Sequence, residues 1–157
     1  MGTKCTVFSV GEADFQESAL DTVDTSLPKY DDLTSKATAG QTPMIELGVV
    51  WQALHFALGN RPAEDPLGFL AKGGEPVPAL DDGERSSGRY FSPERSKELL
   101  NALRLLSDAA LAANLAIPRP TLAKLDAVDG MRLFDRLRAF VAEAVAANRG
   151  IIVHLFL

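Results

Sequence analysis

The last seven residues, IIVHLFL (151–157), constrain the fold more than any other stretch of the chain. Apolar residues occupy nearly every position, so a strand formed by this segment has two apolar faces. Such a strand is typical of the centre of a sheet that is covered on both sides. We therefore expect the C-terminus to form a central strand.

Two amphipathic helices are predicted in the second half of the chain. One covers residues 131–150, with Asp129 as its cap and Gly150 as its end. The other covers residues 92–115 and begins at Ser92, a favourable N-cap residue. We expect both helices to pack against the C-terminal strand through apolar stripes with helical spacing. The stripes are Leu99, Leu103, Leu106 and Ala110 in the earlier helix, and Phe134, Leu137, Phe140, Val141, Ala144 and Val145 in the later one.

The first half of the chain contributes shorter elements. CTVFSV (5–10) is rich in β-branched residues and predicts a first strand that ends at Gly11. EADFQESAL (12–20) predicts a short helix. VVWQALHFAL (49–58) predicts a helix of about three turns that ends at Gly59 and Asn60. The whole chain is therefore expected to form one sheet that includes its first and last segments, covered by three or four helices.

Two stretches between these elements are expected to lack long regular structure. Residues 21–43 consist mostly of Thr, Ser, Asp, Gly and Pro, and a loop of this length is uncommon in a compact domain unless it is functional or flexible. Residues 61–91 are rich in Pro and Gly and are expected to form mainly turns, with a short helical turn at PLGFLA.

Four segments occur in order over residues 44–157: LGVVWQALHFALGN, DPLGFLAKGGEPV, SGRYFSPERSKELLNAL and FDRLRAFVAEAVAANRGIIVHLFL. In these segments the chain resembles the YfbM-like family of bacterial proteins of unknown function. The resemblance implies a single compact α/β domain over residues 1–157, a three-layer sandwich in which helices cover a mixed sheet. It implies no established activity. The chain departs from the family pattern at Val49, where Lys or Arg is usual, and at DDGERSSGR.

The composition argues against several classes of partner and cofactor. No apolar run approaches the ~18–20 residues of a membrane span, and no basic cluster with interleaved aromatic residues indicates nucleic-acid binding. The single cysteine fits a reducing cytoplasm, where we expect the protein to be located. The two histidines, His55 and His154, lack metal-ligand spacing, so neither a metal nor a cofactor is expected.

The net charge of −5 arises entirely from residues 1–60, where eight acidic side chains accompany three basic ones. An acidic N-terminal part can meet a basic partner, because opposite surface potentials steer association. A solvated acidic surface is the simpler interpretation of the same pattern.

Trp51 and His55 lie four residues apart in the predicted 49–58 helix and therefore share one face. They can form a pocket wall that contains a titratable imidazole. They can equally be structural, with Trp51 in the core and His55 near the C-terminal end of the helix, where free carbonyls favour a cationic ring. We expect the structural arrangement, with His55 at the core edge facing the 61–91 loop.

Four further residues are candidates for ligand or partner binding. Gly73 and Gly74, in KGGEP, can present backbone amides to an anion or form a tight turn with positive φ. Asp81 begins DDGER (81–85), which places two aspartates near Arg85 and Arg89; this segment does not match a calcium-binding loop and is expected to form local ion pairs. No nucleophile motif is present, so no catalytic residue is assigned.

These observations favour a cytoplasmic binding protein that masks a protein partner, for example an immunity protein that neutralises a bacterial toxin. The acidic N-terminal part and the 61–91 loop would form a polar rim around a few apolar anchors. The alternative is a small-ligand-binding protein or an enzyme with a pocket near Trp51, His55 and Arg89. The sequence does not define an oligomeric state.

Overall fold

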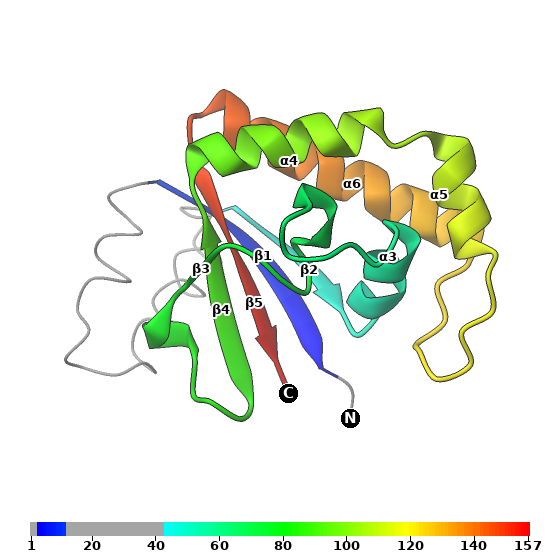
Figure 1. Ribbon diagram of the computed structural model, residues 1–157, viewed down its shortest axis with the longest axis horizontal. Coiled ribbons are helices and arrows are strands. Elements are labelled where there is room, and N and C mark those ends of the chain that lie inside the picture. The colour runs from blue at the N-terminus through cyan, green and yellow to red at the C-terminus, as the bar shows by residue number, and fades with distance from the viewer. Residues whose placement is uncertain (1–2, 12–42) are drawn as a thin grey trace.

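The computed structural model describes residues 3–11 and 43–157. Five described strands form one sheet in the order β2-β1-β5-β4-β3 (Figure 1). Each of the four pairings is antiparallel. The strands are β1 (Lys4–Val10), β2 (Met44–Gly48), β3 (Glu75–Pro76), β4 (Ser86–Phe91) and β5 (Gly150–Phe156).

The C-terminal strand lies at the centre of the sheet, as its two apolar faces predict. β5 pairs with β1 on one side and with β4 on the other. Ile151, Ile152 and Val153 are completely buried, although their side chains alternate between the two faces. The first residue of the strand, Gly150, has no room for a side chain, because a Cβ there would lie only 2.5 Å from the Phe91 carbonyl oxygen and 2.6 Å from the Tyr90 ring.

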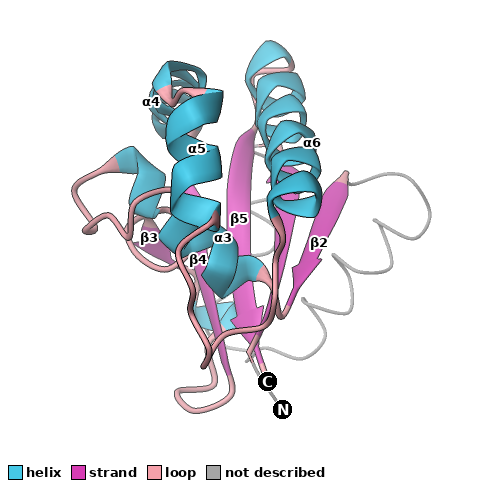
Figure 2. Cartoon of the chain, turned by 90° about the vertical axis from the view of Figure 1, so that its right-hand side faces the viewer, coloured by secondary structure: helices cyan, strands magenta, loops and turns pink. Residues whose placement is uncertain are grey.

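The described α-helices all cover one face of this sheet (Figure 2). They are α3 (Trp51–Ala57), α4 (Pro93–Leu105), α5 (Asp108–Leu115) and α6 (Ala127–Ala146). Their buried side chains form one core with the β1, β2, β4 and β5 residues that point toward them. None of the described helices is long and apolar enough to cross a membrane.

A smaller apolar cluster lies on the opposite face of the sheet. Two short 3-10 turns, η1 (Pro66–Gly68) and η2 (Pro78–Leu80), occur between α3 and β4, and η2 contributes Leu80 to this cluster. The other buried members are Phe8, Val10, Val77, Tyr90 and Ile152.

The predicted α/β fold, with helices covering a sheet that includes the N- and C-terminal strands, is confirmed. Two details differ within the described residues. The sheet is antiparallel rather than mixed, because every neighbouring pair runs in opposite directions. The α-helices form one layer on the sheet, so two layers of the expected three are described. The predicted 12–20 helix and the 21–43 loop lie outside the described residues, apart from Pro43.

The single helix predicted over residues 92–115 is wrong, because the segment forms α4 and α5 with a break between them. Leu106 has extended backbone angles, and Ser107 caps a new helix: its hydroxyl accepts a hydrogen bond from the Ala110 amide at 3.1 Å. A serine followed by an aspartate is typical of the start of a helix. The prediction followed the apolar spacing, which continues across this point, and so did not place a break there. Ala110, expected in the stripe, is exposed, and Leu111 is buried instead.

The second long helix also has different ends from those predicted. It begins four residues earlier, because the Asp126 carboxylate accepts a hydrogen bond from the Asp129 amide at 2.8 Å and is therefore the cap. Asn148, with φ of 54°, adopts the left-handed conformation after the helix, which leaves Gly150 free to start β5. Phe134, Leu137, Val141 and Ala144 are buried as expected, whereas Phe140 and Val145 are only half-buried.

Candidate functional site

Trp51 is a core residue, as predicted. It is the first residue of α3, and its side chain is buried against the end of the sheet. The indole Nε1 donates a hydrogen bond to the Thr3 carbonyl at 2.9 Å, which ties α3 to the residue before β1. The ring centroid lies 6.4 Å from that of His55, so the two rings share one side of the helix. Trp51 therefore contributes mainly to packing.

His55 is only 4% exposed and lies at the end of α3. Its Nε2 is 3.0 Å from Asn60 Oδ1. Because the amide oxygen can only accept, the ring proton sits on Nε2. Within the described part of the chain, the buried Nδ1 has no hydrogen-bond partner.

Burial opposes the cationic form of His55 that the helix end would favour. Burial lowers the pKa of His55 below its usual value, and the positive charges of Lys72 and Arg89 lower it further, although the Asn60 hydrogen bond acts in the opposite direction. Desolvation therefore outweighs the attraction of the helix carbonyls, and the ring is neutral. Lys72 and Arg89 both belong to residues 61–91, so His55 does lie near that segment, as predicted.

Arg89 anchors a turn. Its Nη2 donates to the Leu70 carbonyl at 2.7 Å and its Nη1 to the Gly73 carbonyl at 3.4 Å. The guanidinium carbon also lies 5.9 Å from the centre of the Phe91 ring. Burial lowers the pKa of Arg89 to about 10, so the group stays charged at neutral pH. These contacts fix the segment that crosses the sheet between α3 and β4.

Cys5 lies beside these groups in β1, and its thiol is buried. Burial raises the pKa of Cys5 to about 12, although the charge of Arg89 acts in the opposite direction. The thiolate is the reactive form of cysteine, so this thiol is chemically quiet in the folded protein.

Gly73 and Gly74 have φ of 81° and 74°, as expected for a tight turn that requires positive φ. They line a hollow of about 460 Å³, which we call the α4 hollow. Its other walls are residues 63–66, the Phe91 ring and the Arg95, Glu98 and Leu99 side chains. The sequence analysis missed the contribution of α4, because these residues come together only when β4 turns into the helix.

Asp81 lies elsewhere, on an exposed turn. Its carboxylate accepts a hydrogen bond from the Gly83 amide at 2.8 Å, and it shares a second hollow of about 440 Å³ with Trp51, Ser87 and Leu155. The neighbouring Asp82 accepts hydrogen bonds from three amides, with that of Arg85 the strongest in effect, and they lower the pKa of its carboxyl group.

The six predicted site residues therefore do not form one site. Contacts link Trp51 to His55 and Arg89 to Gly73, but neither hollow is lined by His55 or Arg89. The donors of Arg89 are directed at backbone carbonyls rather than at open space. Among the described residues, no group of three or more His, Cys, Asp or Glu side chains could hold a metal ion.

A third hollow, of about 400 Å³, lies where α5 ends and the chain returns to α6. Apolar residues dominate its walls, including Leu115, Ile117, Leu122 and Leu125. Ile117, which lines this hollow, is 51% exposed. Two large apolar side chains outside its walls are also exposed: Val128, near the start of α6, by 66%, and Leu105, at the other end of α5, by 86%. We use the name α5 end for residues 105–128, which run from the last residue of α4 through the whole of α5 to the start of α6 (Figure 1). Sequence reasoning missed this surface, because it treated residues 92–115 as one helix with one buried stripe.

Comparison with known proteins gives a family and a fold. The family model for a domain of unknown function, DUF1877, matches residues 1–154. Among solved structures, the chain is similar to YfbM, a protein of unknown function from Escherichia coli, with a TM-score of 0.62 and 12% sequence identity. The match covers 98% of this chain and 99% of YfbM. No curated protein matches the sequence. At this level of identity, the likeness to YfbM concerns the fold alone.

Proposed function

The chain belongs to the DUF1877 family, as the resemblance to YfbM-like proteins predicted, and from this premise we propose that it is a binding protein that masks a surface of a partner protein. An immunity protein that covers the functional site of a bacterial toxin is the form of this activity that we favour. The proposal rests on one observation, the exposed apolar surface of the α5 end.

Large apolar side chains are concentrated in this part of the molecule. Five such side chains are exposed among the described residues, and three of them, Leu105, Ile117 and Val128, belong to the α5 end. Single exposed apolar residues are ordinary, whereas an exposed apolar side chain that lines an apolar hollow, as Ile117 does, is typical of a protein-binding surface. A masking partner would bury these side chains.

The composition of α5 supports the same interpretation. The helix has the sequence DAALAANL, and only Leu111 is buried among its eight residues. Ala109, Ala110 and Ala113 are exposed. A helix that is apolar on most sides usually lies inside a protein, so its exposure here is consistent with a surface that becomes covered in a complex.

Charged side chains surround this apolar surface. Arg104 and Asp108 flank the start of α5, while Arg119 and Lys124 lie along the return to α6, and all four are at least partly exposed. Arg119 stacks on Phe56 at 5.2 Å and donates to the Asn114 carbonyl at 2.9 Å, which holds the rim in place. An apolar centre with a polar rim is the usual anatomy of a protein interface.

The proposed apolar anchors lie in a different part of the chain from the one that the sequence-based hypothesis gave. We expected the 61–91 loop to surround them, but three of the five exposed large apolar side chains among the described residues lie at the α5 end and none lies in that loop. Seven of the eight acidic residues in positions 1–60 lie outside the described residues, so the acidic part of the hypothesis remains a prediction.

Co-expression with tagged products of the genes adjacent to its own tests this proposal. We expect one of these products to co-purify with the wild-type chain and to lose its own activity in the complex. A Leu105→Asp, Ile117→Asp variant should abolish co-purification. Leu157→Asp is the matched control, because Leu157 is 58% exposed but lies at the C-terminus. The masking proposal is wrong if the complex forms without inhibition, or if the control weakens binding as much as the double variant.

A further inference from the structure

The α4 hollow carries an inference that is independent of partner masking. It lies between the start of α4 and the 61–74 segment, whereas the proposed masking surface begins at the other end of α4. Its volume of about 460 Å³ falls within the roughly 300–1,000 Å³ of pockets that hold small molecules. We propose that this hollow binds a free α-amino acid with an apolar side chain, as a zwitterion.

The floor of the hollow is apolar and fixed. Phe91 and Leu99 are both buried beneath it, and Phe69 supports the Phe91 ring edge-on, with 6.3 Å between ring centres. Gly74 packs so closely on Phe91 that a Cβ would come within 3.0 Å of the ring. The floor is therefore fixed, with 6% of Phe91 and 1% of Leu99 exposed in the unbound protein.

The walls are held from below. Arg89 binds the carbonyls of Leu70 and Gly73, which secures the wall that contains Lys72. On the opposite wall, the Asp65 carboxylate accepts a hydrogen bond from the Leu67 amide at 2.9 Å, and Arg61 lies 3.8 Å from the same carboxylate. A preformed site of this kind lowers the entropic cost of binding.

Four other charged side chains line this hollow and have no hydrogen-bond or ion-pair partner among the described residues. Glu64 and Glu98 are acidic, and Lys72 and Arg95 are basic. None of the four side chains has an ion pair or a hydrogen bond with another described residue. Asp65 also lines the hollow, but Arg61 lies 3.8 Å from its carboxylate; the four side chains without a partner carry two charges of each sign, which suits a ligand with one charge of each sign.

The spacing on α4 suits the two charges of an amino acid. Arg95 and Glu98 are three residues apart, so their side chains are neighbours on one helix face. An α-amino acid carries its ammonium and carboxylate groups on one carbon atom, only a few ångströms apart. The carboxylate would be bound by Arg95, with Lys72 beside it, and the ammonium by Glu98, with Glu64 beside it. The side chain would then lie over Phe91 and Leu99.

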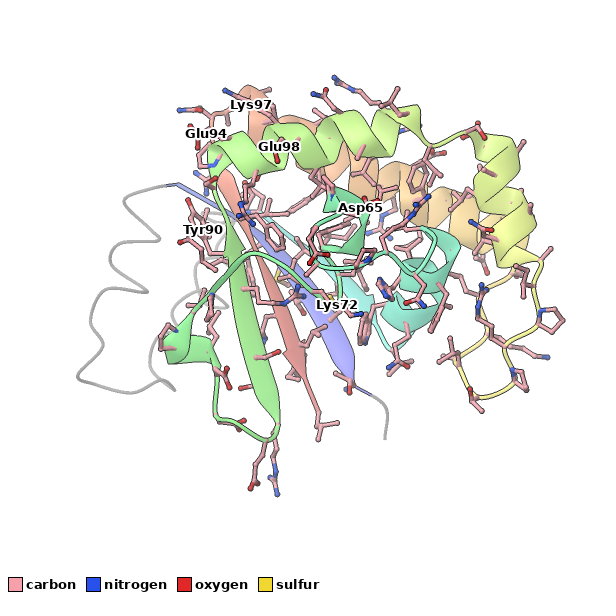
Figure 3. All side chains as sticks on the ribbon, in the orientation of Figure 1. Asp65, Lys72, Tyr90, Glu94, Lys97 and Glu98 are labelled. Carbon is pink, nitrogen blue, oxygen red and sulfur yellow. The ribbon has the colours of Figure 1, made fainter. Side chains whose placement is uncertain are left out.

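Figure 3 shows why α4 also supplies matched controls. Glu98 lies on the side of α4 that faces the viewer, above Asp65, whereas Lys97 lies on the upper side and Glu94 at the start of the helix. Neither Glu94 nor Lys97 lines the hollow. Substitutions at these positions remove the same charges from the same helix without altering the proposed site.

Calorimetric titration of the full chain at neutral pH tests the proposal. The probes are L-leucine, L-methionine, L-phenylalanine and L-tryptophan, each tested alone, with glycine as the ligand that lacks a side chain. We expect saturable one-to-one binding of at least one of the four, and binding of glycine at least tenfold weaker. The N-acetyl and the amide derivatives of the bound amino acid lack one charge each, and both should also bind at least tenfold weaker.

Variants connect that binding to the hollow. Arg95→Gln and Glu98→Gln should each weaken binding at least tenfold, whereas Glu94→Gln and Lys97→Gln should leave it unchanged, with thermal unfolding recorded to show that all four fold. The proposal is overturned if none of the four amino acids binds at millimolar concentration. It is also overturned if a derivative with one charge binds as tightly as the zwitterion, or if the control variants weaken binding as much as the variants in the hollow.

Discussion

Helices α4 and α5 follow one another in the chain, yet they relate to the core in opposite ways. α4 buries Ser96, Leu99, Leu100 and Leu103 along one side, and charged residues occupy its other side. α5 is more apolar on average but buries only Leu111. The arrangement of apolar residues around a helix, rather than their number, therefore determines how many of its side chains are buried in the core.

The last turn of α4 also separates two kinds of surface. Leu103 in α4 is completely buried, whereas Leu105, two residues later, is 86% exposed. The same residue type therefore serves the core at one position and lies on the proposed partner surface at the other. Substitutions in α4 and α5 test whether the two helices differ in this way.

The largest effect is expected for Leu103→Asp. The substitution would place an unpaired carboxylate in the core, which should cost about 5 kcal/mol or more and abolish cooperative folding. Leu105→Asp is the matched control and should unfold at nearly the wild-type urea concentration. If Leu103→Asp yielded soluble protein with a cooperative unfolding transition, the assignment of α4 to the core would be wrong.

A smaller loss is expected for Leu111→Ala, because Leu111 is the one buried side chain of α5. Truncation of a buried leucine costs about 2–5 kcal/mol. Urea denaturation measures the change in free energy of unfolding, and hydrogen exchange should show the greatest loss of protection in α5. A loss below about 1 kcal/mol would mean that α5 does not depend on this anchor.

Removal of the α5 cap should have a moderate effect. Ser107→Ala deletes the hydroxyl that accepts the Ala110 amide, which should cost about 1 kcal/mol. Ser92→Ala at the start of α4 removes a similar bond, to the Arg95 amide at 3.2 Å, and should cost about the same. Ser107→Asp, which restores an acceptor, should recover most of the stability. If it does not, the break between the helices is not held by its cap.

The smallest effect on stability is expected for Ala113→Glu on the exposed side of α5. A surface substitution of this kind usually changes stability by less than about 0.5 kcal/mol. It should nevertheless prevent co-purification of the masked partner, because it places a charge within the apolar surface. Normal co-purification together with wild-type stability would remove α5 from the proposed interface.

The elements with strong periodicity could be predicted from the sequence. The central position of residues 151–157, the strand at 5–10 and the burial of Trp51 all follow from local apolar patterns. Strands β2 and β4 were not predicted, since MIELG is short and SSGRYF lies in a segment rich in Gly and Pro. Their pairing partners, β1 for one and β5 for the other, are far away in the sequence.

The candidate sites were less predictable than the fold. Gly73 and Gly74 were identified because positive φ leaves a signature in the residue type. Arg95 and Glu98 carry no such signature, because a charged pair on a helix usually faces solvent. They reach a hollow only because the 61–74 segment packs beside α4. His55 shows a third limit: its neutral state depends on burial and on two distant positive charges, which helix position alone does not reveal.

The burial of Cys5 has a practical consequence for following the molecule in solution. Cys5 is the only cysteine of the chain, and its strand is hydrogen-bonded to a neighbour on each side. With its pKa raised to about 12, the thiol reacts with an alkylating reagent at neutral pH only after the sheet has opened. The rate at which Cys5 is alkylated therefore measures how often the central strands of the native protein open, and no engineered label is needed.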